Sequence, residues 1–121
     1  MGQLVDGKWQ ISSIITSGKK GEFKRPDRSF RDVVSSDHNI FKPESGRYHL
    51  YVSYACPWAH RTLIYRSLKG LENHISINVV HPDILDSGWS FSSDYPGATG
   101  DELYQKQYLL LGFVIIHHIY K

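Results

Sequence analysis

The sequence of 121 residues contains a single cysteine, Cys56, and a single methionine. One cysteine cannot form an internal disulfide, and it cannot build a metal site that uses several cysteines. A lone cysteine is typical of a protein in a reducing compartment, or of a protein whose thiol has a function. The thiol of Cys56 is therefore the first group whose chemistry has to be explained.

The chain also lacks a long apolar run and an excess of one charge. Its most apolar stretch, residues 108–120, is shorter than the roughly 20 residues that span a bilayer. No apolar segment of the secretory-signal kind follows Met1. The 14 Lys and Arg nearly balance the 12 Asp and Glu, which favours no nucleic-acid partner. We expect a soluble, cytoplasmic protein with no membrane and no nucleic-acid partner.

One basic segment allows a second interpretation. Residues 19–31 hold six basic and two acidic residues, interleaved with Phe23 and Phe30. In a nucleic-acid-binding protein the cations would contact phosphates and the rings would stack on bases. Because no nucleic-acid-binding motif accompanies this segment, we interpret it as a solvated extension anchored by its two phenylalanines.

The centre of the chain predicts a strand, a helix and a second strand. Residues 47–53 and residues 75–80 alternate in polarity with the period of a strand. Between them, residues 57–69 are predicted to form a helix, with Pro57 at its first position and Gly70 as its stop. Apolar residues recur at helical spacing, namely Leu63, Ile64, Leu68 and Leu71. Such a βαβ unit favours a parallel strand pair and belongs to the α/β class.

The other segments are less regular. Residues 1–46 are polar and rich in turn-forming residues, and we expect an N-terminal extension there. Residues 82–100 contain two prolines and three glycines and are expected to form a long loop. Residues 101–106 are compatible with the start of another helix, and the apolar tail is compatible with a buried strand or a buried helix.

Cys56 falls at the N-cap of the predicted helix, directly before Pro57. The free N–H groups and the positive end of the helix dipole favour a thiolate there, and His60 and Arg61 add positive potential. A thiolate attacks disulfides and thioethers. Because Ala59 stands where a second cysteine would be, turnover needs an external thiol, for which glutathione is the abundant cytosolic candidate. The alternative is a buried cysteine that packs as a small apolar residue.

Two aromatic residues and several histidines are further candidates for a functional site. Trp89, in a Gly/Ser-rich loop, either presents its face to a ligand or anchors the loop on the core. Tyr54 either donates a hydrogen bond to a bound sulfur or is a strand-end aromatic. The candidate histidines for a metal site with Cys56 are His60, His74, His81, His117 and His118. No second pair shows zinc-type spacing, so we expect no metal.

The string at residues 53–61, SYACPWAHR, resembles the active-site signature of the glutathionyl-hydroquinone reductases. These proteins are also called xi-class glutathione transferases and are related to the omega class. Further matches lie at residues 2–7, Trp9, 21–25, 30–31, 61–64, 68–71, 80–82 and 88–91. The resemblance extends over about residues 1–109.

The resemblance implies an enzyme with a thioredoxin-like N-terminal domain, with glutathione as co-substrate, and usually a homodimer. In such an enzyme the thiolate, here Cys56, attacks the glutathione sulfur of a glutathionyl-hydroquinone. The hydroquinone leaves, and a second glutathione resolves the mixed disulfide as oxidised glutathione. Trp89 is implied as a contact to glutathione.

The sequence also departs from this family. No proline follows Pro96, so the family's Val-Pro step has no counterpart, and neither do its acidic–Ser pair and its helical C-terminal domain. From about Leu110 the sequence resembles an out-of-frame tail, which predicts that the coding sequence resumes the family pattern in another frame. We therefore expect an N-terminal extension, an incomplete thioredoxin-like domain and an apolar tail, at residues 1–46, 47–109 and 110–121. The alternative function is that of a truncated, catalytically inactive remnant or an interaction module.

Overall fold

The structure is a computed structural model that describes residues 2–11, 16–17, 21–24 and 31–109. The apolar tail lies outside these residues, so its predicted secondary structure is not tested. No helix among the described residues combines the length and the apolarity that crossing a bilayer requires.

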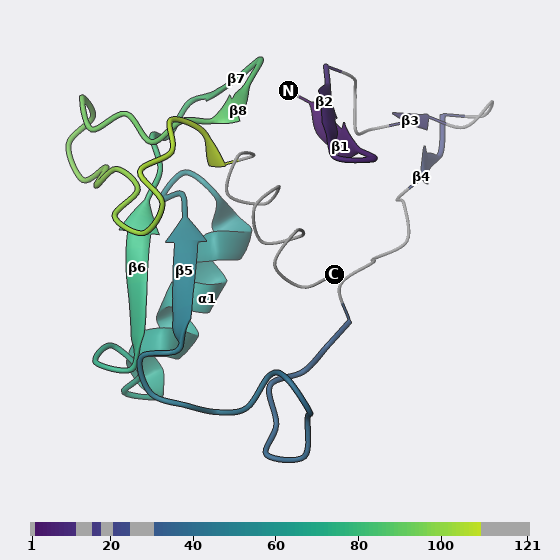
Figure 1. The fold of residues 1–121 in the computed structure, drawn as a ribbon. Coiled ribbons are helices and arrows are strands. Elements are labelled where there is room, and N and C mark those ends of the chain that lie inside the picture. Colours follow the sequence, from purple (N-terminus) through teal and green to yellow (C-terminus); the bar gives the residue numbers. More distant parts are fainter. Residues whose placement is uncertain (1, 12–15, 18–20, 25–30, 110–121) are drawn as a thin grey trace.

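A β–α–β unit forms the centre of the fold (Figure 1). Strand β5 (Tyr48–Val52) is followed by helix α1 (Pro57–Leu68) and by strand β6 (Ile75–Val79). The two strands pair in parallel over their full lengths, and α1 connects them. The predicted α/β class and all three predicted elements are confirmed.

The ends of α1 follow from the residues that bound it. Pro57 occupies the first turn, where its missing N–H costs no hydrogen bond. At the other end Gly70 adopts a φ of 63°, a left-handed conformation that glycine reaches without steric cost. The Leu71 N–H donates to the Arg66 carbonyl at 2.9 Å, and the Gly70 N–H donates to the Ser67 carbonyl at 3.0 Å. This pair of bonds is the Schellman motif, which ends the helix.

The apolar core between α1 and the strands is small. Val52 and Val79 pair across the sheet and are 4% and 3% exposed. No residue of α1 is buried, and two members of its apolar row, Ile64 and Leu68, are 45% and 76% exposed. Among the apolar residues of α1 at helical spacing, only Leu63 is half-buried. A sheet of two strands is narrow and covers only a thin stripe of the helix surface.

A polar network covers the other face of the strand pair. The Asn78 side chain is fully buried, and its amide donates to the Thr99 hydroxyl at 2.9 Å. The Tyr51 hydroxyl donates to the Asp101 carboxylate at 2.8 Å. Through these bonds the segment after residue 98 is held against β5 and β6 by satisfied polar groups, as buried polar groups require.

Residues 101–106, which are compatible in sequence with the start of a helix, form a turn and no helix. Asp101 does accept the N–H groups of Leu103 and Tyr104, as a helix N-cap would. However, Gln105 adopts a left-handed φ of 54°, and the Lys106 N–H turns back to the same carboxylate at 3.0 Å. The segment is therefore a single turn closed around one side chain.

This network shifts the pKa values of its members. Burial raises the pKa of the Asp101 carboxyl, but the hydrogen bonds from Lys106, Tyr104, Tyr51 and Leu103 outweigh burial and leave it below its usual value. Burial and the hydrogen bond to Asp101 raise the pKa of Tyr51. Burial lowers the pKa of His49 from its ordinary value of 6.5, against smaller opposing contributions from Asn78 and nearby carboxylates.

The remaining strands form short antiparallel hairpins. In the N-terminal extension, β1 (Gln3–Val5) pairs with β2 (Lys8–Gln10), and β3 (Thr16–Ser17) pairs with β4 (Phe23–Lys24). The β1–β2 turn is Asp6-Gly7, and both residues have positive φ, which is the two-residue turn that matches strand twist.

The predicted long loop at residues 82–100 contains a hairpin that the sequence analysis missed. Strand β7 (Ile84–Leu85) pairs with β8 (Gly88–Trp89) across the turn Asp86-Ser87. The strands are two residues long, which is too short for a period-two pattern to appear in the sequence.

Replacing Asp101 by alanine removes the acceptor of the Tyr51 hydroxyl and of three backbone N–H groups. We expect the free energy of unfolding to fall by about 3 kcal/mol, since each of the four hydrogen bonds contributes about 1 kcal/mol and water can replace part of them at this partly exposed edge. Urea denaturation measures this loss. The control Tyr51→Phe removes one bond and should cost about 1 kcal/mol; equal losses in the two variants would contradict the central role of Asp101.

The same network predicts two steps in stability as the pH falls. The pKa of His49 is lower in the folded protein than in the unfolded chain, so stability declines as the pH drops below about 6.5. The pKa of Asp101 is also lower in the folded state, so its stabilisation is present at neutral pH and is lost below about pH 4. Urea denaturation across this range should show that Asp101→Asn loses the lower step and keeps the upper one. An unchanged lower step would assign it to other carboxylates.

Candidate active site

The candidate nucleophile lies in the turn between β5 and α1. Ser53, which is 4% exposed, accepts the Ala55 N–H with its hydroxyl oxygen at 3.2 Å and the Cys56 N–H with its carbonyl at 3.1 Å. Cys56 is then the N-cap, with extended backbone angles, and its carbonyl accepts the His60 N–H at 3.0 Å. The predicted position of Cys56 at the start of the helix is confirmed.

The Cys56 thiol is partly open to solvent at the start of a helix. The thiol is half-exposed and makes no capping hydrogen bond. The first turn of α1 carries no acidic residue, so the positive end of the helix dipole is not neutralised there. The thiol is therefore accessible and lies at the positive end of the α1 dipole.

The three residues predicted to support the thiolate surround the turn without bonding to the sulfur. Tyr54, His60 and Arg61 are all exposed. In the part of the chain that the structure describes, none of them forms a hydrogen bond with Cys56. The Tyr54 ring instead faces Gly97, where an added Cβ would lie 3.5 Å from the ring. Support for the thiolate from these residues stays a prediction based on charge and proximity along the chain.

The parallel pairing brings the segment that carries Trp89 to the same edge as Cys56. Since β5 and β6 run in the same direction, their carboxyl ends meet at one edge, where ligands of α/β proteins bind. The Val80 N–H donates to the Val52 carbonyl at 2.9 Å at this edge. The chain then continues into β7 and β8, and Trp89 is half-buried on β8. The contact of Trp89 with glutathione stays a prediction.

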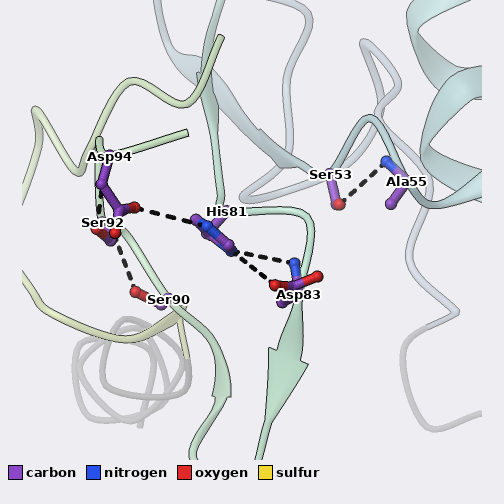
Figure 2. A network of polar contacts seen from close by, with 7 residues as sticks. All are labelled: Ser53, Ala55, His81, Asp83, Ser90, Ser92 and Asp94. Carbon is purple, nitrogen blue, oxygen red and sulfur yellow. Dashed lines mark hydrogen bonds and ion pairs between the residues drawn. The ribbon is translucent and has the colours of Figure 1, made fainter. Parts of the chain in front are cut away.

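A cluster around His81 lies at this edge and was not predicted (Figure 2). The Asp83 N–H donates to Nδ1 of the His81 ring at 3.1 Å, so the proton of the neutral ring lies on Nε2. That Nε2 is 3.5 Å from Oδ1 of Asp94, and the Ser92 hydroxyl donates to the same oxygen at 2.6 Å. The hydrogen bond from Ser92 lowers the pKa of Asp94.

The His81 cluster joins the loops that border the site. The His81 ring makes an edge contact with the Tyr95 ring, at 5.5 Å between centroids, and the His81 N–H donates to the Ser90 carbonyl at 2.9 Å. The segment from residue 90 to 97 is thereby tied to the end of β6 and reaches Tyr54 beside the nucleophile. In the sequence, the nearness of Asp83 to His81 is the only sign of this cluster. The other residues of the cluster, at 90–94, are separated from His81 along the chain.

The described residues offer little else that resembles a ligand site. An open cavity of about 470 Å³ lies beside the β7–β8 turn and is lined by Ile84, Leu85, Asp86, Ser87 and Tyr108. Cys56 is not among its lining residues. Within the described residues, no group of three His, Cys, Asp or Glu side chains is arranged to hold a metal ion.

The β–α–β unit whose helix begins at Cys56 is similar to the thioredoxin-like N-terminal domain of the glutathione transferases. No family model matches the chain. The chain is 50% identical over 116 residues to glutathionyl-hydroquinone reductase YqjG of Escherichia coli, covering 90% of this chain and 35% of the relative.

Solved structures agree with this similarity. The xi-class glutathione transferase of Natrialba magadii superposes with a TM-score of 0.77 at 46% identity, over 94% of this chain and 33% of that protein. The glutathione-bound structure of Escherichia coli YqjG superposes with a TM-score of 0.61 at 59% identity, over 62% of this chain and 24% of that protein.

The particular resemblance is thus confirmed: the chain is similar to the glutathionyl-hydroquinone reductases, the xi class of the glutathione transferases. The match covers most of this chain, but the chain spans only about a third of the length of glutathionyl-hydroquinone reductase YqjG.

The positive potential at Cys56 can be tested by removing one charge. We expect Arg61→Gln to slow alkylation of Cys56 by iodoacetamide at pH 7 about two- to threefold, and 1 M salt to abolish the difference by screening. Lys69→Gln, at the far end of α1, is the matched control and should leave the rate unchanged. Equal rates for Arg61→Gln and the unaltered protein would remove Arg61 from the site.

Proposed function

We propose that this chain carries the nucleophile of a glutathione-dependent reductase that removes glutathione from glutathionyl-hydroquinones. The observation that carries the proposal is the accessible thiol of Cys56 at the N-cap of α1, at the carboxyl edge of a parallel strand pair. The similarity to a protein named glutathionyl-hydroquinone reductase supports the substrate class. A glutathione-bound relative supports glutathione as the ligand.

In the proposed reaction the Cys56 thiolate attacks the glutathione sulfur. A sulfur–sulfur bond forms and the bond between that sulfur and the ring carbon breaks. The electron pair stays on the ring carbon, which takes up a proton, and the hydroquinone leaves. A second glutathione then attacks the mixed disulfide, so that oxidised glutathione departs and the thiolate is restored. Two glutathione sulfurs are oxidised to one disulfide while the substrate is reduced.

The other residues have assigned roles in this proposal. Trp89 contacts the bound glutathione from β8, and Tyr54, His60 and Arg61 support the thiolate from the turn and the first turns of α1. Because Ala59 replaces a second thiol, the mixed disulfide is stable until free glutathione arrives. The protein acts in the cytoplasm, where glutathione keeps thiols reduced, and works as a homodimer without a metal.

The direct test follows the mixed disulfide. The reduced protein is incubated with a glutathionylated hydroquinone, quenched in acid and analysed by intact mass, with Cys56→Ser as control. We expect one glutathione on the protein with Cys56, released hydroquinone, and no adduct on the variant. Trp89→Ala should weaken adduct formation about tenfold, since a stacking aromatic contact is worth about 1 kcal/mol or more.

Two outcomes would contradict this function in different ways. If iodoacetamide labels Cys56 but no glutathione adduct forms, the thiol is accessible and the glutathione site is not assembled. The chain would then be a catalytically inactive remnant or an interaction module. An adduct on Cys56→Ser would mean that glutathione attaches elsewhere.

A further inference from the structure

Trp9 of the N-terminal extension connects two hairpins that are far apart in the sequence. Its indole N–H donates to the carbonyl of Asp86 at 2.7 Å. Trp9 lies on β2, and Asp86 is the first residue of the turn between β7 and β8. Figure 1 shows the two hairpins next to one another. The hydrogen bond therefore fixes the tip of one hairpin on the side of the other.

The ring of Trp9 also lies against two glycines. Gly88 is buried and follows the β7–β8 turn with a φ of 82°, and a Cβ there would lie 3.3 Å from the ring. Gly2 also lies against the ring, where a Cβ would be 2.8 Å from it and 2.5 Å from the Gln10 carbonyl oxygen. A side chain would clash at Gly2, and at Gly88 it would meet the ring in a tight contact on a left-handed backbone, so the ring packs closely against Gly88.

The β7–β8 hairpin depends on such support because it is small. Each strand has two residues, and both Ile84 and Leu85 on β7 are exposed. An isolated two-stranded hairpin is marginally stable in water, and this one contributes few buried side chains of its own. Trp89 follows Gly88 directly, so any movement of the turn on Trp9 moves Trp89 as well.

We propose that Trp9 is a positioning residue that holds the β7–β8 hairpin, and through it Trp89, in the place where glutathione binds. This inference rests on the proposed function, in which Trp89 contacts glutathione. Trp9 acts through Gly88 and Asp86 and does not touch the reacting sulfur. Part of the N-terminal extension thereby belongs to the machinery of the site.

The experiment compares Trp9→Phe, which keeps the ring packing and loses the N–H, with Trp9→Ala, which loses both. The matched control is Lys8→Ala, an exposed neighbour on β2 that points to the opposite side. Each protein is labelled with 5-fluorotryptophan, and the ¹⁹F resonance of Trp89 is assigned with Trp89→Phe. Glutathionylated hydroquinone is then titrated into the same proteins, and the rate of adduct formation on Cys56 is measured by mass.

We expect the Trp89 resonance to shift or broaden in both Trp9 variants and to stay unchanged in Lys8→Ala. The half-saturating substrate concentration should rise about tenfold in Trp9→Ala and less in Trp9→Phe, because small displacements of a positioning group cost one to two orders of magnitude. The rate at saturation and the iodoacetamide labelling of Cys56 should stay within about twofold, because the thiol is not moved. Gly88→Ala, which pushes on the same ring, should reproduce Trp9→Ala.

The measurements distinguish a failure of the positioning role of Trp9 from a failure of the proposed function. An unmoved Trp89 resonance in Trp9→Ala overturns the positioning role whether or not glutathione binds. A moved resonance with unchanged half-saturation also overturns it, because Trp89 would then not depend on Trp9 for its contact. If the unaltered protein forms no adduct at all, the proposed function fails first, and the positioning role falls with it. Labelling of Cys56 in Trp9→Ala at the rate of the urea-unfolded protein would indicate general unfolding, and Trp9→Phe then decides the question.

Discussion

The parallel pairing of β5 with β6 is the constraint on which the rest of the structure depends. Parallel neighbours cannot be joined by a tight turn, so the chain has to cross over, and here it does so through α1. The crossover places a helix N-terminus directly after β5, and Cys56 is the residue found there. The same pairing brings the end of β6, with the His81 cluster and the β7–β8 hairpin, to the edge where the thiol lies.

The two faces of this strand pair are stabilised by different interactions, apolar burial on one face and hydrogen bonds on the other. On the side of α1, a few valines and the half-buried part of the helix exclude water, and much of the helix stays exposed. On the other side, Asn78 and Asp101 gather backbone and side-chain donors from a segment without regular secondary structure. A loop can be held this way because the buried side-chain atoms of Asn78 and Asp101 find partners in it. The result is a site bordered by loops that polar contacts and one tryptophan hold in place.

The sequence pattern predicts the fold correctly where a local signal suffices. The alternation of residues 48–52 and 75–79, Pro57 at the start of α1 and Gly70 at its end each act within a few residues, and the structure agrees with all of them. It failed at the β7–β8 hairpin, whose strands are too short for periodicity, and at the turn after Asp101, where a left-handed Gln105 overrides an N-cap. The helical spacing of apolar residues also did not predict that a sheet of two strands buries so little of the α1 surface.

The sequence by itself determined the order of strand, helix and strand, the place of the single thiol before the helix, and the likeness to the glutathionyl-hydroquinone reductases. These follow from local periodicity, from capping residues and from a motif that is contiguous in the chain. Only the tertiary structure decided that Trp9 reaches the turn at Asp86, that Asp94 faces His81, and that Asp101 organises the loop over β5 and β6. Each of those contacts joins segments that lie apart along the chain, and its energy depends on a geometry that exists only once the strands have paired.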